Sequence, residues 1–305
     1  MTNDIPVIDY EGSQYRADFW VDQGRDYEDA TERLALTQLL PANGGRIAEI
    51  GAGFGRLADL YVGYEQIILF DYSRSLLQDA AREWGHDPRF VFVAGNIYTL
   101  PLASATLDTL VMVRVMHHLA DVPAALQQLR RVMHRYSVGV VEFANKRNLK
   151  ALARWALHRQ EWSPLDRNPV EFVKLNFDFH PDWMAAQVTD AGLATRQRLG
   201  VSHFRMATLK KRVSAQRLAA LDRKLFAPGG TFPLAPSVFM QVGVSAGNER
   251  SGAATAPDNI AGILRCARCG SEPLQRVSDD RVACMACDAV YAKQHGVWDM
   301  KAAIG

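Results

Sequence analysis

The stretch RIAEIGAGFGR, residues 46–56, decides the fold of this chain. An apolar strand ends at Glu49 and enters a glycine-spaced turn, after which we expect a helix to begin. Glycine has no side chain to block a ligand and tolerates positive φ, and the N–H groups of the new helix would point at that ligand. The spacing is GxGxG, whereas the dinucleotide fingerprint is GxGxxG with a small residue last, a place that Arg56 holds here. The turn therefore favours a nucleoside ligand without a pyrophosphate, with S-adenosylmethionine as the leading candidate.

Length and composition indicate an ordinary globular protein. The 305 residues suffice for one large domain and a small one, and 48% of them are hydrophobic. A net charge of +2 does not by itself imply a nucleic-acid partner. The N-terminus lacks a basic segment followed by an apolar core, and no apolar run approaches the roughly 18 to 20 residues that span a bilayer. We therefore expect a cytoplasmic protein with no secretory signal and no membrane span.

Strand and helix patterns alternate along the first half of the chain. The strands are short and nearly all apolar, as expected when helices cover both faces of a parallel sheet. This pattern predicts an α/β protein with a doubly wound, mostly parallel, seven-stranded sheet. The predicted strands are Arg46–Ile50, Gln66–Phe70, Phe90–Ala94, Leu107–Val113, Val138–Phe143, one near Thr195–Leu199 and Pro236–Val244. The predicted helices are 54–62, 74–84 with Ser73 as its cap, 122–133 opened by Asp121, and one from His180.

Two acids flank the glycine turn in this predicted sheet. Asp71 ends the second strand, twenty positions after Gly51, where a carboxylate can accept both ribose hydroxyls of an adenosine. Glu49 can receive the methionine ammonium group of the cofactor, directly or through water. The alternatives are a helix cap for Asp71 and, for Glu49, a buried acid satisfied by turn N–H groups. We favour the ligand role for both acids.

Two more loops follow the third and fourth predicted strands. Asn96 could pair with the adenine amino group and Ile97 could cover the ring, although Asn also suits a simple turn. The segment Arg114–His118 should lie near the reacting methyl group, because ligands bind outside the carboxyl ends of strands in doubly wound sheets. His117 and His118 are candidate general bases near neutral pH. Hydrogen bonds that support the loop are the favoured alternative for each histidine.

The end of the fifth predicted strand holds a further candidate. Glu142 and Asn145 could line an acceptor pocket, or Glu142 could only pair with Lys146 or Arg147. We leave these two interpretations open.

All four cysteines lie near the C-terminus, as two CxxC pairs separated by fourteen residues. Four thiolates on two tight turns suit a closed tetrahedral zinc site, which has no open position for catalysis. So small a module cannot bury a large hydrophobic core, so we expect it to need the bound metal ion in order to fold. A redox dithiol is disfavoured, because that motif accompanies a βαβ pattern. The predicted zinc ligands are Cys266, Cys269, Cys284 and Cys287.

Residues 40–145 resemble the class I S-adenosylmethionine-dependent methyltransferases, in the group that includes the ubiquinone and menaquinone methyltransferases. The resemblance is carried by EIGAGFG (49–55), FDYS (70–73), GNI (95–97), LPLASATLDTLVMVRVMHHL (100–119) and VVEFAN (140–145). It implies a Rossmann-like fold and S-adenosylmethionine as cofactor. The expected cofactor-binding residues are Glu49, Gly51, Ala52, Gly53, Gly55, Asp71, Tyr72, Asn96, Ile97, Arg114, Val115 and Arg25, and the catalytic candidates are His117, His118 and Glu142.

Residues 260–300 look like the small zinc-ribbon family that activates tRNA, rRNA and release-factor methyltransferases as a separate subunit. The four cysteines and the tail AVYAKQHGVWDM carry this resemblance. It implies a structural zinc ribbon that docks on its own catalytic domain and covers an apolar surface or a sheet edge. The expected organisation is an N-terminal helical lid (1–40), a methyltransferase domain (41–245), a linker (246–259) and the zinc ribbon (260–305).

These patterns predict an enzyme that transfers a methyl group to an N, O or C atom. The lid would cover the cofactor, with Arg25 facing its carboxylate and Tyr15, Trp20 and Tyr27 beside it. A small molecule is the favoured acceptor. An RNA or protein acceptor is the alternative, because the ribbon resemblance and the basic stretches 146–159 and 205–224 suit phosphates, although such charge is usually a solvated helix face. A non-enzymatic cofactor-binding adapter is disfavoured by the intact glycine turn.

Overall fold

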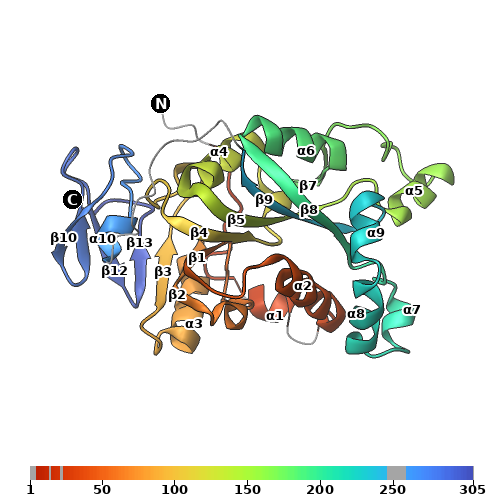
Figure 1. Cartoon of the computed structure of the whole chain (residues 1–305), viewed down its shortest axis with the longest axis horizontal. Coiled ribbons are helices and arrows are strands. Elements are labelled where there is room, and N and C mark those ends of the chain that lie inside the picture. The colour runs from red at the N-terminus through yellow and green to blue at the C-terminus, as the bar shows by residue number, and fades with distance from the viewer. Residues whose placement is uncertain (1–4, 14, 21–22, 246–258, 305) are drawn as a thin grey trace.

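The computed structural model describes residues 5–13, 15–20, 23–245 and 259–304 (Figure 1). One continuous sheet runs through both halves of the chain in the order β10-β11-β12-β13-β3-β2-β1-β4-β5-β9-β8. Its strands are β1 (Gly44–Ile50), β2 (Tyr64–Asp71), β3 (Phe90–Ala94), β4 (Leu107–Met112), β5 (Met133–Ala144), β8 (Leu193–Val201), β9 (Ser237–Val244), β10 (Gln275–Ser278), β11 (Arg281–Ala283), β12 (Val290–Gln294) and β13 (Val297–Asp299). A separate hairpin joins β6 (Val170–Val173) and β7 (Asn176–Asp178).

Seven of these strands, from β3 to β8, form the doubly wound part of the sheet. The strands β3, β2, β1, β4 and β5 are parallel, and β9 pairs antiparallel with both β5 and β8. The Rossmann-like, mostly parallel arrangement is thus confirmed. The predicted size of seven strands is wrong for the sheet as a whole, which has 11. The difference arises because the C-terminal residues add their four strands to the edge of β3.

Helices cover both faces of the sheet, as Figure 1 shows. The helices are α1 (Tyr15–Phe19), α2 (Asp26–Leu39), α3 (Arg74–Trp84), α4 (Val122–Val132), α5 (Leu149–Ala156), α6 (Pro181–Asp190), α7 (Ala207–Lys210), α8 (Ala215–Arg223), α9 (Phe226–Thr231) and α10 (Ile260–Ile263), with the 3-10 turns η1 (Ala58–Tyr61), η2 (Ile97–Thr99) and η3 (Met116–His118). Ile47 packs with apolar residues of α2 and α3, whereas Ala48 packs with those of α4 and α6. Successive residues of one strand therefore serve opposite layers.

Two helix starts agree with their predicted caps, and one predicted helix is absent. The Ser73 hydroxyl accepts a hydrogen bond from the Leu76 N–H, and the Asp121 carboxylate accepts one from the Ala124 N–H. The helix predicted over 54–62 is wrong: the turn continues to Leu57 and only the 3-10 turn η1 follows. The glycine-rich turn holds the backbone away from α-helical angles, with positive φ at three glycines.

The helical lid predicted over 1–40 is helical only in part. Residues 5–10 carry no helix, whereas α1 and α2 lie further along. The predicted linker 246–259 lies outside the described residues except for Asn259, which caps α10. None of the helices in the described part of the chain is long and apolar enough to cross a membrane.

The C-terminal cysteine module, residues 259–304, packs directly on the larger half of the chain. Strand β13 runs parallel to β3, and the Met300 N–H donates to the Ala94 carbonyl at 2.8 Å. The Ala103 N–H donates to the Ile263 carbonyl, also at 2.8 Å. Buried Trp298 and Met300 belong to the same apolar cluster as α4. The module therefore extends both the sheet and the core.

Candidate functional site

A cavity opens at the carboxyl ends of β1, β2, β3 and β4, where the sequence places its site. Eight of the predicted residues line it together: Gly51, Gly53, Asp71, Tyr72, Ile97, Arg114, Val115 and His118. Gly95, Ile50, Phe70, Leu76 and Leu119 complete the wall, and Val7, Ile8, Tyr10 and Tyr15 come from the N-terminal segment. The meeting of four strand ends explains how residues far apart in the sequence share one wall.

The glycine turn is held by hydrogen bonds within the protein. The N–H groups of Gly51 and Ala52 both donate to the Phe70 carbonyl, and that of Gly55 donates to the Ala52 carbonyl. The expectation that the turn and a new helix aim free N–H groups at the ligand is therefore wrong for these residues. A phosphate would need such donors, whereas a nucleoside needs close approach to the backbone.

Gly51 supplies that close approach. Its φ is +80°, and a Cβ added there would lie 2.1 Å from Cγ2 of Val115. Gly55 has φ +78° but faces Leu69, Ala80 and Trp84, so it serves the packing of α3 on the sheet. Ala52 is buried and does not line the cavity.

Asp71 joins the turn to the start of α3. One carboxylate oxygen accepts from the Gly53 N–H at 2.7 Å, and the other accepts from the Ser73 N–H at 2.8 Å. Burial raises the pKa of this carboxyl, and the backbone donors oppose that shift. Each oxygen keeps a second lone pair, so the group can still accept from a bound diol.

Asn96 and Glu49 lie outside the cavity wall. The Asn96 side-chain oxygen accepts from the Tyr98 N–H at 2.9 Å, which is the turn-forming role weighed as its alternative. Glu49 is buried beneath the turn, and burial raises its pKa to about 8. Its Oε2 has no hydrogen-bond partner among the described residues. Burial therefore keeps this carboxyl protonated near neutral pH, and a cation that arrives with a ligand would favour its ionised form.

The two histidines after β4 have different surroundings. His118 lines the cavity, with Nδ1 3.2 Å from the Leu175 carbonyl and Nε2 3.4 Å from the Tyr10 hydroxyl. These contacts match the supporting role weighed for it. The ring of His117 lies 3.9 Å from that of His118, centroid to centroid. Burial, His118 and Arg114 hold the pKa of His117 well below its usual value, so the ring is neutral at pH 7.

Glu142 supports the loop that carries Arg114. Its Oε2 accepts from the Arg114 N–H at 2.9 Å, and the Ser237 hydroxyl donates to its Oε1. It forms no ion pair with Lys146 or Arg147 in the described structure, and Lys146 instead donates to the Asn168 carbonyl. The Arg114 backbone has φ 59°, an uncommon value for a residue with a side chain.

Asn145 has a structural place in the fold. Its side-chain nitrogen donates to the carbonyls of Pro233 and Ala235 at 2.7 and 2.8 Å. The residue is buried, so these contacts tie the end of β5 to the segment before β9.

The N-terminal segment contributes to the cavity wall, with only one of the four residues that we expected there. Tyr15 lines the wall, whereas Tyr27 is buried and its hydroxyl accepts from the Phe204 N–H. Arg25 stands at the N-cap of α2, with its guanidinium carbon 5.7 Å from the Trp20 ring centroid. Sequence reasoning missed Val7, Ile8 and Tyr10; the apolar run IPVI at residues 5–8, directly before Asp9, was the available signal.

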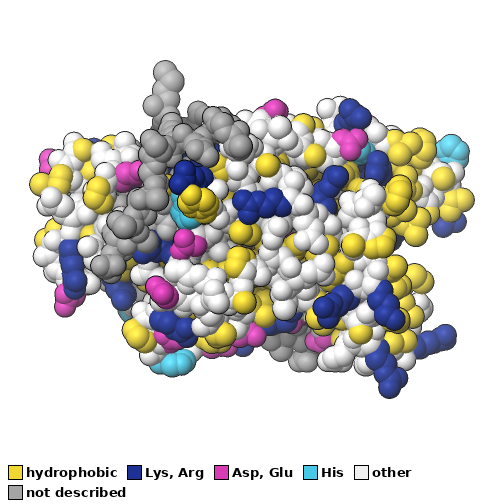
Figure 2. Space-filling view, in the orientation of Figure 1, with side chains coloured by type: hydrophobic (Ala, Val, Ile, Leu, Met, Phe, Trp, Pro, Cys, Tyr) yellow, Lys and Arg dark blue, Asp and Glu magenta, His cyan; other side chains and the backbone are white. Residues whose placement is uncertain are grey.

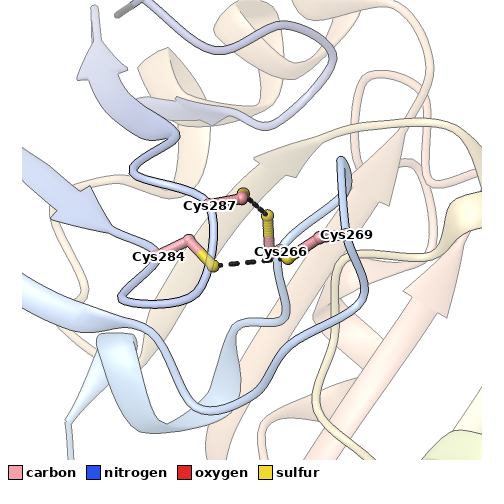
Figure 3. A group of neighbouring side chains, drawn as sticks. All are labelled: Cys266, Cys269, Cys284 and Cys287. Carbon is pink, nitrogen blue, oxygen red and sulfur yellow. Dashed lines mark hydrogen bonds between the residues drawn. The ribbon is translucent and has the colours of Figure 1, made fainter.

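The four cysteines meet in the C-terminal module, as Figure 3 shows. Their sulfur atoms all lie within 4.8 Å of one another, with 3.6 Å between Cys266 and Cys287 and 3.5 Å between Cys269 and Cys284. None forms a disulfide. A tetrahedral zinc ion with bonds of about 2.3 Å would set its sulfur ligands about 3.8 Å apart. The spacing therefore fits the predicted ion.

Residues 48–140 match the profile of the methyltransferase domain family. The chain contains a methyltransferase domain. The match covers the glycine turn, Asp71 and the loop after β4, and it confirms for this domain the predicted enzyme class.

Curated relatives match parts of the chain. A 37.1 kDa protein in transposon Tn4556 of Streptomyces fradiae is 32% identical over 83 residues, which are 27% of this chain and 24% of that protein. The 27-O-demethylrifamycin SV methyltransferase of Amycolatopsis mediterranei is 28% identical over 130 residues, 40% of this chain and 48% of that enzyme. The chain thus spans about a quarter and about half of these two relatives.

Solved structures resemble a larger share of this chain than the curated relatives do. An S-adenosylmethionine-dependent methyltransferase from Thermotoga maritima has a TM-score of 0.53 at 17% identity, covering 75% of this chain and 97% of that chain. One from Mesorhizobium loti has a TM-score of 0.51 at 21% identity, covering 71% and 99%. A chain in the complex of the Haloferax volcanii Trm112 methyltransferase activator with its partner has a TM-score of 0.51 at 16% identity, covering 76% and 97%. These likenesses concern the fold.

Proposed function

We propose that the protein transfers a methyl group from S-adenosylmethionine to a small-molecule acceptor. The observation that carries this proposal is the cavity itself, in which the Asp71 carboxylate and the bare backbone of Gly51 face one space at the ends of β1 and β2. The carboxylate suits a ribose diol, and the glycine suits a ligand that lies against the chain.

The residues present fit the cofactor at three places. Asp71 retains accepting capacity after its two backbone contacts. Gly51 leaves a space that a Cβ would fill. Glu49 has a buried oxygen without a hydrogen-bond partner in the described structure, and the amino-acid ammonium group of the cofactor would satisfy it directly or through water. Ile97, Tyr72 and Val115 would hold the adenosine between apolar walls.

The remaining residues position the reactants and exclude water. S-adenosylmethionine supplies an electrophilic methyl group, so the protein needs little further chemistry. The N-terminal residues Val7, Ile8 and Tyr10 add apolar surface to the cavity wall, which would reduce the water around the reacting atoms. Glu142 and His118 fix the loop after β4. His117 is not among the residues that line the cavity, and the pKa of its ring lies well below the usual value, so it is a weak proton acceptor.

Several observations favour a small acceptor over RNA. Figure 1 places the basic helices α5, α7 and α8 at the end of the molecule opposite the cysteine module. On the face in Figure 2, lysines and arginines occur in separate groups instead of one band. Exposed apolar side chains, among them Leu149 and Leu157, interrupt the basic segment around α5. The Amycolatopsis relative is itself named for a small-molecule acceptor.

For the cysteine module we propose a structural zinc ribbon that stabilises the methyltransferase domain. Its β13 covers the edge of β3, and its apolar residues continue the core. An uncovered edge strand is prone to aggregate. The Haloferax volcanii activator forms a complex with a methyltransferase that is another protein. The cysteine module here belongs to the same chain as the methyltransferase domain.

Calorimetry with S-adenosylmethionine tests the proposal, followed by a methyl-transfer screen on fractionated metabolites and RNA. The cofactor should bind wild-type protein, and Asp71→Ala should weaken binding by about tenfold or more, because a charge-assisted contact is lost. Lack of cofactor binding by wild-type protein would overturn the proposal. Methyl transfer to bulk RNA that falls steeply with salt would favour the RNA alternative.

A further inference from the structure

Two segments, 149–173 and 206–234, carry most of the exposed apolar side chains. Of the sixteen large apolar residues that are exposed in the described part of the chain, eleven lie in these segments. The segments contain α5, α7, α8 and α9, which Figure 1 places at one end of the molecule, and Figure 2 shows hydrophobic and basic side chains gathered there. Single exposed apolar residues are normal, whereas such a concentration marks a surface for interaction.

Hydrogen bonds join the two segments. The Leu149 N–H donates to the Leu234 carbonyl at 2.9 Å, so the start of α5 lies beside the residues that follow α9. The Lys146 Nζ donates to the Asn168 carbonyl at 2.6 Å, which brings the loop before β6 to the same helix. Helix α8 leads into α9 after two residues. The exposed apolar side chains therefore belong to one surface, here called the α5 surface.

Helix α5 turns an apolar row toward solvent. Leu149, Ala153 and Ala156 lie at positions i, i+4 and i+7, on one side of the helix, and all three are exposed. Ala151 is the one residue of this helix that is buried. A surface helix normally packs its apolar face against the core. The apolar face of α5 is instead uncovered by the described part of the chain.

The same end of the molecule has an excess of positive charge. Residues 146–178 and 205–234 contain fourteen lysines and arginines against five aspartates and glutamates. The whole chain has 35 and 33 of these residues and a net charge of +2, so the remainder of the chain has an excess of negative charge. The α5 surface is therefore the basic pole of the protein.

Acids of the chain neutralise few of these cations. Arg167 and Lys210 form ion pairs, at 3.3 and 2.9 Å, with carboxylates outside the two segments. Asp222, the only acid in residues 205–234, is fully buried. Lys150 and Arg154 lie four residues apart on α5, are exposed beside its apolar row and form no ion pair in the described structure. These two charges are available to a partner.

An uncovered apolar row beside free cations matches an anionic lipid surface. An interfacial helix inserts its apolar side chains at the boundary of the acyl chains and holds lysines and arginines at the anionic headgroups. The long stems of lysine and arginine let their charges stay at the headgroups while apolar neighbours insert. A second copy of the chain would bring like charges together, and RNA phosphates would leave the apolar side chains in water.

We propose that the α5 surface docks the protein on an anionic lipid bilayer. Leu149 and Leu157 insert among the lipids, and Lys150 and Arg154 bind the headgroups. The association is reversible, because α5 spans eight residues and inserts few apolar side chains. The proposal uses no residue of the cofactor cavity, so it stands or falls separately from the methyl-transfer reaction.

Co-sedimentation of the full-length protein with vesicles tests this proposal. The anionic vesicles contain phosphatidylcholine with about 30% phosphatidylglycerol, and pure phosphatidylcholine is the neutral comparison. Wild-type protein should bind the anionic vesicles about tenfold more tightly or better, and added salt should weaken that binding. Brominated lipids should quench tryptophan fluorescence, and Trp155→Phe should reduce the quenching, because Trp155 is exposed on α5.

Two variants of α5 separate the charges from the apolar row. Lys150→Gln/Arg154→Gln should weaken binding to anionic vesicles by about tenfold or more. Leu149→Gln/Leu157→Gln should weaken it by a similar factor of about ten. Both variants should keep the melting temperature of wild type, because all four side chains are exposed. If one variant fails to fold, the other still tests the surface.

The matched controls change exposed residues of the same kinds on the C-terminal module. Arg281→Gln/Lys293→Gln and Val277→Gln/Ile304→Gln should bind anionic vesicles like wild type. Equal binding of wild type to both kinds of vesicle, or α5 variants within about twofold of these controls, would overturn the proposal. Failure of wild type to bind vesicles would also overturn it. In that event, a dimer that Leu149→Gln/Leu157→Gln dissociates would assign the surface to a second copy, and salt-dependent binding of bulk RNA would assign it to nucleic acid.

Discussion

At the scale of single residues, Gly51 is the position where the turn tolerates least change. In Gly51→Ala the new Cβ would lie 2.1 Å from Cγ2 of Val115, and the backbone would keep φ near +80°. We expect cofactor affinity to fall by about tenfold or more and stability to fall by about 1–2 kcal/mol from the backbone strain alone. Calorimetry and thermal denaturation measure the two effects.

A second substitution separates the clash from the strain at Gly51. Val115→Ala removes the γ-carbons that the new Cβ would strike, so Gly51→Ala/Val115→Ala should recover part of the stability that Gly51→Ala loses. Gly53→Ala is the milder comparison, because its nearest contact would be 4.0 Å away. Equal losses in the Gly51 and Gly53 variants would contradict this account of the turn.

Glu49 should make stability depend on pH in a definite direction. Its pKa rises from an ordinary 4.5 to about 8 in the folded protein, chiefly by burial. Between these values the unfolded chain has lost the proton that the folded protein retains, so the contribution of Glu49 to stability decreases as pH rises. Relative to wild type, Glu49→Gln should gain about 1.4 kcal/mol per pH unit in this window. Denaturant unfolding at pH 5 to 8 measures this difference, and a pH-independent difference would refute it.

The sequence predicted the residues whose backbone position determines their role. Asp71, Tyr72, Ile97 and Val115 reach the cavity because each lies at the end of a strand or just after it. The sequence could not predict which side chains form hydrogen bonds to nearby backbone groups and are therefore turned away from the cavity. The oxygen of Asn96 caps η2 instead of facing the cavity, because a short amide readily bonds to a nearby N–H.

At the scale of elements, the C-terminal module meets the N-terminal segment at the rim of the cavity. Lys301 lies 3.8 Å from Glu11 and 5.0 Å from the Tyr72 ring centroid, and the Glu11 carboxylate accepts from the Arg74 N–H at the start of α3. Lys301→Ala should therefore loosen the N-terminal cover and weaken cofactor binding by about threefold. Lys293→Ala, on the exposed side of β12, is the control. Equal cofactor affinities of the two variants would show that the module does not act through this contact.

Apolar strands were predictable and the segment after the turn was not. Continuous apolar runs such as QIILF specify buried parallel strands, and β2 contains that run. The apolar spacing of 54–62 suggested a helix. Instead, the short 3-10 turn η1 and the residue before it bury Tyr61 and Leu57 in the core without a full α-helix. Apolar periodicity predicts which residues are buried. It does not determine whether an α-helix or a 3-10 turn buries them.

At the scale of the whole molecule, the junction of the two halves lay beyond sequence reasoning. The pairing of β13 with β3 joins residues about two hundred positions apart, and no local pattern encodes it. The short strand VWD gave little periodic signal, and its register is set by contact with Phe92, Val93 and Ala94. The resemblance to a separate activating ribbon was the feature that indicated a covered sheet edge.

Because the sheet is continuous, loss of the metal from the C-terminal module should lower the stability of the whole protein. Removing zinc, by chelation or by Cys284→Ser, would release the two CxxC turns, and with them β13 and the buried Trp298. Because that release uncovers β3 and part of the shared core, we expect one cooperative unfolding transition that shifts down by about 10 °C or more. Metal analysis should first give about one zinc per chain. Calorimetric scans with and without chelator then decide: an unchanged main transition, with only a small separate loss, would show that the methyltransferase domain is stable without its C-terminal module.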